Sequence, residues 1–296
     1  MKKTLGILGA VLCVFVLFIA PSASPAGRNG YYRFPAIHGG TIVFTSEGDL
    51  WTVDAKGGTA RRLTSHTGQE TNPAISPDGL TLAFSAQYEG PTEVYTMPLA
   101  GGLPERRTFA GQGETVVGWT PDGKILYATQ RYSTLPNTQL VVLDPAINRE
   151  VLLPLSQAAD GSFDLSAKTL YFTRLAFQGS YTKRYKGGTA QNIWSYPLGG
   201  DEAAPLTADY AGTSKNPMVW QGRIYFLSDR DGSMNICSMD VGGGGLRQHT
   251  FHKGFDASSP SLDAGRIVYQ LVADLHIYDP ASGADPALAI TLPSDF

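Results

Sequence analysis

Three groups of residues in this sequence have types and spacings that could support chemistry. The stretch Ser228–Asp240 reads SDRDGSMNICSMD and sets two aspartates around an arginine, just before a glycine. His249 and His252 lie three positions apart in HTFH. The segment 174–191, RLAFQGSYTKRYKGGTAQ, contains basic and aromatic residues and no acidic one. These patterns suggest, in turn, a calcium or active-site loop, a zinc site and an anion-binding surface.

The first two patterns fit structural turns better than metal sites. A calcium loop of the EF-hand type alternates its ligands and has glycine at the sixth position, whereas Gly232 lies only three residues after Asp229. We expect SDRDG to be a hairpin turn in which Gly232 supplies a positive φ, with a bound cation as the alternative. His249 and His252 straddle the end of an expected strand and have no third ligand nearby in sequence, and His276 alternates within another strand. No metal site is therefore predicted.

The segment 174–191 is the strongest candidate for a binding surface. Its basic residues are interleaved with aromatic ones on a chain that is otherwise mildly acidic. Such a positive patch with aromatic faces suits carboxylates or a peptide chain. In the alternative interpretation, the aromatic rings pack the loop onto the fold and the basic groups point to water. The predicted binding residues are Arg174, Tyr181, Lys183, Arg184, Tyr185 and Lys186.

Local motifs for catalysis are missing from the sequence. It contains no GxSxG nucleophile elbow, no HExxH and no phosphate loop ending in GK[ST]. The glycines of VGGGG, residues 241–245, are expected to form a turn between strands and not to lead into a helix. We predict no catalytic residue and no cofactor for this chain.

Residues 1–26 are predicted to be a secretory signal peptide. Lys2 and Lys3 precede an apolar run from Leu5 to Ala20, which is shorter than the roughly 20 residues that span a bilayer, and small residues follow it. An uncleaved membrane anchor is the alternative. Without Lys2 and Lys3 the chain has 21 basic and 26 acidic residues, a formal charge of −5. We expect a periplasmic or secreted protein that binds neither nucleic acid nor, after cleavage, the membrane.

The remaining residues repeat one pattern six times. Each copy has a short opening stretch, a run of β-branched and aromatic residues, a third run and a closing strand; the second runs are TIVFT, TLAFS, KILYA, TLYFT, RIYFL and RIVYQ. Equivalent positions are spaced by 38, 44, 46, 54 and 43 residues. Periods in the forties with four short strands are typical of propeller blades. Within NICS, Cys237 is expected to be a buried structural thiol.

We therefore predict an all-β chain in which residues 27–296 form a six-bladed β-propeller of four-stranded antiparallel blades. The blades are placed at about 34–64, 71–109, 115–155, 161–207, 215–251 and 258–292. Blade six is expected to end with its own outer strand, ALAIT, at residues 287–291. The ring would then close without strand exchange, through apolar packing of blades one and six alone. The loops after the second and fourth strands are long and varied, and function is expected on their face.

The segments GRIYFLSDRDGSMNICSMDVGGGGLRQHTF and YKGGTAQNIWSYPLGG, together with the leading signal sequence, resemble the amino-terminal propeller of tricorn-type proteases. The likeness runs from about Phe34 to Phe296. It implies a module that guides peptides to or from an enclosed active site, with a second propeller, a PDZ domain and peptidase domains downstream. The chain stops at TLPSDF, where the second propeller would begin, so the resemblance implies a fragment without the catalytic residues of its parent, a serine peptidase.

We expect a non-catalytic module that gates or docks peptides for that peptidase. The alternatives are a stand-alone periplasmic binding or scaffold propeller and the accessory propeller of a prolyl oligopeptidase-like enzyme.

Overall fold

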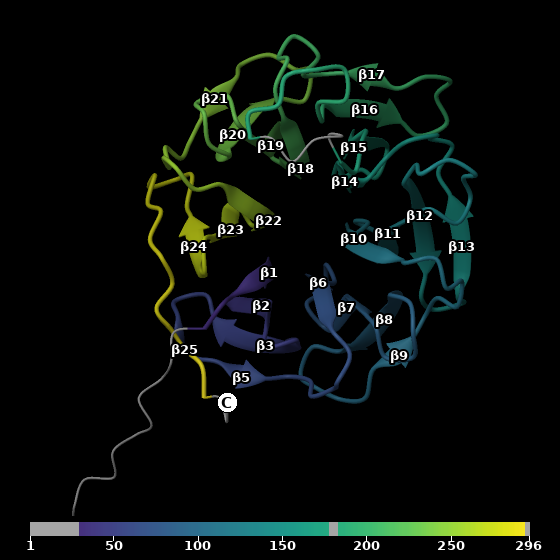
Figure 1. Ribbon diagram of the computed structural model, residues 1–296, viewed down its shortest axis with the longest axis vertical. Helices are drawn as coiled ribbons and strands as arrows, with labels where there is room; N and C mark the ends of the chain where they lie inside the picture. The colour runs from purple at the N-terminus through teal and green to yellow at the C-terminus, as the bar shows by residue number, and fades with distance from the viewer. Residues whose placement is uncertain (1–29, 178–182, 294–296) are drawn as a thin grey trace, which may run out of the picture.

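The computed structural model describes residues 30–177 and 183–293, and within these ranges the chain consists of strands and turns without a helix. The predicted signal peptide, residues 1–26, and Tyr181 lie outside the described residues. Among the described residues no helix is long and apolar enough to cross a membrane. Figure 1 shows six sheets arranged around a central axis, which confirms the predicted all-β propeller.

Five blades are four-stranded antiparallel sheets whose strands follow chain order from the axis outward. Blades one and two contain β1 (Arg33–His38), β2 (Thr41–Ser46), β3 (Asp49–Asp54), β5 (Arg61–Arg62), and β6 (Glu70–Ile75), β7 (Thr81–Ala86), β8 (Glu93–Pro98), β9 (Glu105–Arg106). Blades three and four contain β10 (Thr115–Trp119), β11 (Ile125–Thr129), β12 (Gln139–Asp144), β13 (Arg149–Leu152), and β14 (Asp160–Phe163), β15 (Thr169–Thr173), β16 (Ile193–Pro197), β17 (Ala204–Pro205). Blade five contains β18 (Ser214–Trp220), β19 (Arg223–Ser228), β20 (Asn235–Asp240) and β21 (Arg247–Gln248).

Blade six has three named strands, β22 (Ala257–Asp263), β23 (Arg266–Leu271) and β24 (Asp274–Tyr278). The fourth position is filled by the segment after β24, where Ala287 forms a bridge with His276 and the Leu288 N–H donates to the Leu275 carbonyl at 2.8 Å. The chain then leaves the blade as β25 (Ile290–Thr291), which pairs in parallel with β4 (Gly58–Thr59) at the outer side of blade one.

The second strand of each blade explains why six similar runs recur in the sequence. Phe44, Phe84, Phe226 and Tyr269 on these strands have no exposed surface. Each blade is packed between two neighbouring blades, so both faces of its central strand are buried and need apolar residues. Cys237 on β20 is also buried as predicted, and burial raises the pKa of its thiol to about 11.

In four blades, a buried threonine after the outer strand forms the same hydrogen bond to the third strand. Its hydroxyl accepts a hydrogen bond of 2.9–3.0 Å from a backbone N–H at the beginning of the third strand. The pairs are Thr64 with Leu50, Thr108 with Val94, Thr207 with Ile193 and Thr250 with Ile236. The outer strands have only two residues each in these blades, so this bond secures an edge that has few ladder bonds of its own.

One backbone hydrogen bond, of 2.8–3.0 Å, joins each blade to the next. An N–H at the beginning of an inner strand donates to a carbonyl in the connection between the second and third strands of the preceding blade. The donor and acceptor residues are Glu70 and Gly48, Glu114 and Thr92, Ala158 and Thr138, Ser214 and Gln191, Ala257 and Met234, and Tyr32 and Ala273. The last pair joins blades one and six, so the ring is closed by the same contact that joins all other blades.

The seam between blades one and six contains more than apolar packing, and the prediction that packing alone holds it is wrong. The Gly58 N–H donates to the Ala289 carbonyl at 2.8 Å and the Ala60 N–H to the Thr291 carbonyl at 2.9 Å. Backbone groups need hydrogen-bond partners, and those of β4, in the connection between β3 and β5, find them in β25 and the residue before it. The yellow end of the chain in Figure 1 crosses to blade one at this point.

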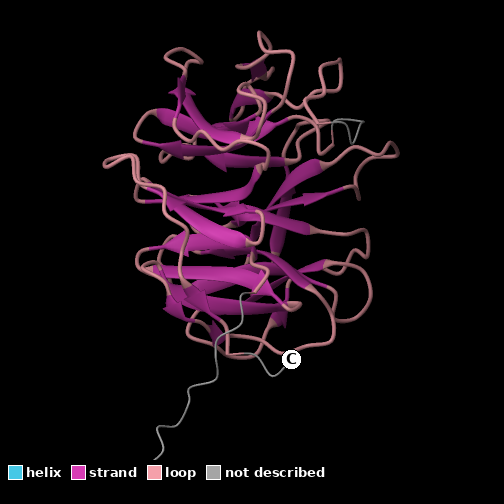
Figure 2. Cartoon of the chain, turned by 60° about the vertical axis from the view of Figure 1, so that its left-hand side comes forward, coloured by secondary structure: helices cyan, strands magenta, loops and turns pink. Residues whose placement is uncertain are grey.

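The stretch SDRDG forms the predicted turn. It connects β19 with β20, Gly232 has φ +88°, and the Gly232 N–H donates to the Asp229 carbonyl at 2.9 Å. In Figure 2, turned by 60° from Figure 1, loops project from both sides of the stacked strands. Connections of seven or eight residues follow the fourth strands, and the longest connection follows the second strand of blade four, as the sequence indicates; after β2 and β23, however, only two residues precede the third strand.

Candidate functional site

The inner strands surround a cavity of about 710 Å³ on the axis of the ring. Its size lies within the roughly 300–1,000 Å³ of ordinary ligand sites. Residues from both ends of the inner strands line it, from Thr138 and Ala176 on the long-loop face to Pro77 and Ala264 at the short turns. Its aromatic walls are Phe34, Trp119, Phe163 and Trp220. The cavity is therefore an axial channel with apolar faces and polar positions between them.

Five of the six inner strands have an irregular register at the channel, and in four of them a residue with positive φ stands at the irregularity. Phe34, Asn72, Asn216 and Ser259 have φ between +47° and +55°, and each precedes a proline. The strand register shifts at all four positions. A residue before proline normally prefers extended backbone, and a left-handed non-glycine residue costs about 1–3 kcal/mol. Strain of this kind at equivalent positions indicates a wall shaped for a function.

These prolines also distinguish one side of the channel from the other. Each inner strand is the free edge of its sheet, and a proline blocks pairing of another chain with such an edge. Blades three and four have Val117 and Phe163 at the equivalent positions, and β14 pairs with β15 without a register shift. An extended chain in the channel therefore meets edges without proline only at blades three and four.

The channel contains charged groups of both signs. Asp160 on β14 accepts a hydrogen bond of 2.9 Å from the Asn216 amide, while its Oδ1 is buried without a hydrogen-bond partner among the described residues. Burial raises the pKa of Asp160. Lys215 of blade five also lines the channel. At the short-turn end, His38 Nδ1 lies 3.7 Å from Asp263 Oδ1. The wall can therefore bind a partner that carries both donors and acceptors.

The structure separates the predicted binding residues of segment 174–191 into different environments. Arg174 donates through Nε to Gln157 Oε1 at 2.8 Å and lies over the Trp194 ring, with 5.5 Å from Cζ to the ring centroid. This places Arg174 between blades three and four, next to Ala176 on the channel wall. The Arg174 side chain is exposed. Among the predicted basic residues, Arg174 is the nearest in sequence to a residue that lines the channel, Ala176.

The second half of the segment lies against blade five. Lys183 Nζ donates to the Gly254 carbonyl at 2.7 Å and lies 3.1 Å from Asp256 Oδ1. Arg184, with φ +58°, donates through Nε to the Gly232 carbonyl at 2.8 Å. Arg184 thus binds the segment to the predicted turn SDRDG, and Lys183 binds it to the connection after β21.

The other predicted binding residues differ in exposure. The Tyr185 hydroxyl accepts a hydrogen bond of 2.9 Å from Thr189 within the segment, and Lys186 is exposed. Ligand binding by the six residues remains a prediction, and no single pocket unites the described ones.

Sequence reasoning missed the channel residues. Asp160 and Lys215 are separated by more than fifty positions and come together only because blades four and five are neighbours. A usable signal was present in the X-Pro pairs that begin at Phe34, Asn72, Asn216 and Ser259, which mark the inner strands. The channel wall can be located from those pairs, although its charges cannot.

Comparison with known proteins agrees with this architecture. Residues 29–284 match the tricorn protease N-terminal beta propeller domain. The chain is 32% identical over 270 residues to tricorn protease homolog 1 of Streptomyces coelicolor, covering 90% of this chain and 25% of that protein. A putative tricorn-like protease N-terminal subunit of Sulfurisphaera tokodaii is 29% identical over 181 residues, covering 58% of this chain and 89% of that protein.

The crystal structure of the tricorn protease superimposes with a TM-score of 0.80 at 26% identity, covering 89% of this chain and 26% of that one. The chain therefore spans about a quarter of the length of the tricorn protease and of its Streptomyces homolog. The match extends over nearly all of the described ring, from its first strand to the segment that follows β24. This chain belongs to the family of tricorn protease N-terminal β-propeller domains.

Proposed function

We propose that this chain is the non-catalytic propeller module of an exported tricorn-like serine peptidase, and that it gates or docks peptides for a catalytic domain outside the chain. The axial channel is the observation that carries this proposal. It has the volume of a ligand site, aromatic walls, and charged groups of both signs. An extended peptide presents the same mixture of apolar side chains, backbone donors and acceptors, and terminal charges.

The arrangement of the channel supports a direction for peptide docking. The proline-free edges of blades three and four lie on the same side as Asp160 and as Arg174. A peptide backbone can hydrogen-bond to such an edge, while the exposed guanidinium of Arg174, beside blade four and outside the channel lining, offers a positive charge to its terminal carboxylate. The proposed partners are peptides and the downstream propeller, PDZ and peptidase domains of the parent protein.

A mixture of oligopeptides tests the proposal on the chain alone. Equilibrium dialysis measures how much peptide the chain retains, and mass spectrometry of the same samples detects cleavage. We expect retention of intact peptides. Cleavage products from a purified chain, or retention no greater than that of an unrelated protein of equal charge, would contradict the proposal.

The closed ring favours one alternative, a stand-alone periplasmic binding propeller. All six interfaces contain the same backbone hydrogen bond, including the interface between the first and last blades. Such a ring is complete without a neighbouring domain. The reading frame downstream of Phe296 decides between the two: a second propeller and a peptidase domain support the proposal, and a stop codon supports the alternative.

Export is the remaining part of the proposal. It rests on the basic, apolar and small-residue regions of positions 1–26. We expect the mature protein in the periplasmic or secreted fraction with a new amino terminus near residue 27. An intact amino terminus in the membrane fraction would instead support the anchor alternative.

A further inference from the structure

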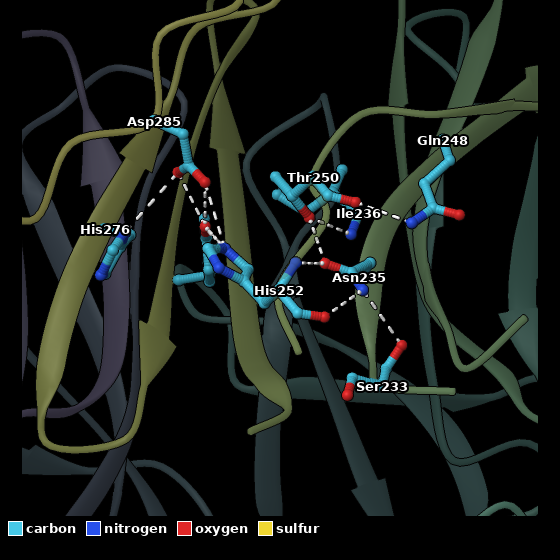
Figure 3. A network of polar contacts seen from close by, with 9 residues as sticks. Ser233, Asn235, Ile236, Gln248, Thr250, His252, His276 and Asp285 are labelled. Atoms are coloured by element: carbon cyan, nitrogen blue, oxygen red, sulfur yellow. Dashed lines mark hydrogen bonds and ion pairs between the residues drawn. The ribbon is translucent and has the colours of Figure 1, made fainter. Parts of the chain in front are cut away.

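Two histidines and an aspartate that are distant in the sequence meet where blade six borders blade five. His252 follows β21, His276 lies on β24, and Asp285 lies in the segment between β24 and β25 (Figure 3). One ligand atom from each side chain lies within 4.8 Å of the other two. The side chains are partly buried, between 17% and 20% exposed, so they are shielded but within reach of a small ion.

The distances in this cluster are close to those of a tetrahedral metal site. With bonds of about 2.1 Å to zinc, two ligand atoms are separated by roughly 3.4 Å. His252 Nε2 lies 3.1 Å from Asp285 Oδ2, and His276 Nδ1 lies 3.8 Å from Asp285 Oδ1. His252 Nε2 also lies 2.6 Å from the Tyr269 hydroxyl, so an ion bound here would replace that contact.

His276 provides a second, independent observation. Its Nδ1 is buried and has no hydrogen-bond partner among the described residues. A buried polar atom without a partner is costly, and native structures contain few of them. The atom faces Asp285 Oδ1 at ion-pair distance and beyond hydrogen-bond distance, so a cation placed between the two side chains would give both atoms a closer partner.

Neighbouring groups position His252 and Asp285. The backbone N–H of His252 donates to Asn235 Oδ1 at 2.8 Å, and Asn235 Nδ2 donates to the backbone carbonyl of His252 at 3.2 Å. Asn235 is fully buried and also accepts a hydrogen bond of 3.0 Å from Thr250. The Tyr269 hydroxyl lies 2.7 Å from both carboxylate oxygens of Asp285. Hydrogen bonds of this kind orient the ligands of metal sites.

We propose that His252, His276 and Asp285 bind one Zn²⁺ ion, with a water molecule in the fourth position. Two imidazoles and one carboxylate suit zinc, whereas magnesium and calcium require more oxygen ligands. Asp285 belongs to the segment that ends in β25, the strand that pairs with blade one. The ion would therefore connect blades five and six to the segment that closes the ring.

Calorimetric titration of the metal-free chain with ZnCl₂ at pH 7.5 tests this proposal. We expect one site per chain, a Tm that rises by a few degrees with saturating Zn²⁺, and no comparable effect of MgCl₂. The variants His276→Ala and Asp285→Asn should bind Zn²⁺ at least roughly tenfold more weakly. His66→Ala, which removes a histidine from the connection between blades one and two, is the matched control and should bind like the unchanged chain.

An NMR measurement keeps the test decisive if a variant does not fold. Zn²⁺ should shift two of the five histidine ring signals of the unchanged protein and leave the other three in place. The absence of saturable binding, or binding that is lost in His66→Ala and kept in His276→Ala, overturns the proposal.

Discussion

The backbone N–H of Tyr32 donates a hydrogen bond of 3.0 Å to the carbonyl of Ala273, and through it the first blade joins the sixth. The Tyr32 hydroxyl also donates to the Ile290 carbonyl at 3.2 Å, and its ring packs at the edge of Phe44, with 5.2 Å between ring centroids. One residue before the first strand thus contacts both the last blade and the closing segment. The ends of the propeller are joined by directional bonds as well as by burial.

The parallel pair β4–β25 should contribute measurably to stability. A Cβ on Gly57, which has φ +86°, would lie 2.6 Å from the Ala289 carbonyl oxygen, whereas a Cβ on Gly48, with φ +91°, would meet nothing within 4 Å. Both Gly→Ala changes impose the same backbone cost of about 1 kcal/mol. We expect Gly57→Ala to lower the free energy of unfolding by about 1–2 kcal/mol more than Gly48→Ala. Equal losses in urea denaturation would show that the seam does not depend on this pair.

Buried Glu114, between blades two and three, should make stability depend on pH. Burial and the nearby Glu93 carboxylate raise the pKa of Glu114 from 4.5 to about 7. The folded state therefore keeps a proton that the unfolded chain loses. The stability from this proton is fully present below pH 4.5 and is lost as the pH rises through 7.

Replacing Glu114 tests this dependence. We expect the free energy of unfolding of the unchanged chain to fall between about pH 5 and 8 by about 1–3 kcal/mol more than that of Glu114→Gln. Glu105→Gln, a change of the same group at a side chain that is 66% exposed, is the control and should keep the original slope. Identical slopes for Glu114→Gln and the unchanged chain would contradict the account.

The predicted binding role of the basic segment 174–191 can be tested at a lysine whose charge is exposed and which does not anchor the segment to blade five. Lys186 is exposed, whereas Lys183 holds the segment to Gly254 and Asp256. We expect Lys186→Ala to weaken binding of a peptide with a free terminal carboxylate but not of its amidated form, because only the former offers the negative charge. Lys56→Ala, at an exposed turn after β3, is the matched control. Unchanged affinity for both peptides would remove Lys186 from the binding residues.

Much of the fold can be predicted from the sequence because propeller blades repeat. The doubly buried second strands yield runs such as TIVFT and RIYFL, and glycine-containing turns such as SDRDG mark their ends. The β4–β25 pair could not be predicted, since it involves two residues in each strand and has no period. Its existence depends on where the segment after β24 meets the connection between β3 and β5.

The candidate sites were less accessible to sequence reasoning. His252, His276 and Asp285 form no local motif, because only the folding of blade six against blade five brings them together. The positions of Lys183 and Arg184 against blade five were likewise hidden, because they depend on a segment of blade four that crosses to its neighbour. Contacts between distant segments leave no local pattern in a single sequence.

Peptide binding in the axial channel can be tested by filling the channel with a large side chain. Gly118 lines the channel, and a Cβ there would meet nothing within 4 Å, so Gly118→Trp fills open space without a backbone clash. Gly242 is equally open but lies in the turn after β20, so Gly242→Trp is the control. Fluorescence anisotropy of a labelled oligopeptide should show binding to the unchanged chain and to Gly242→Trp, and at least tenfold weaker binding to a folded Gly118→Trp. Equal affinity for all three proteins would show that peptides do not bind in the channel.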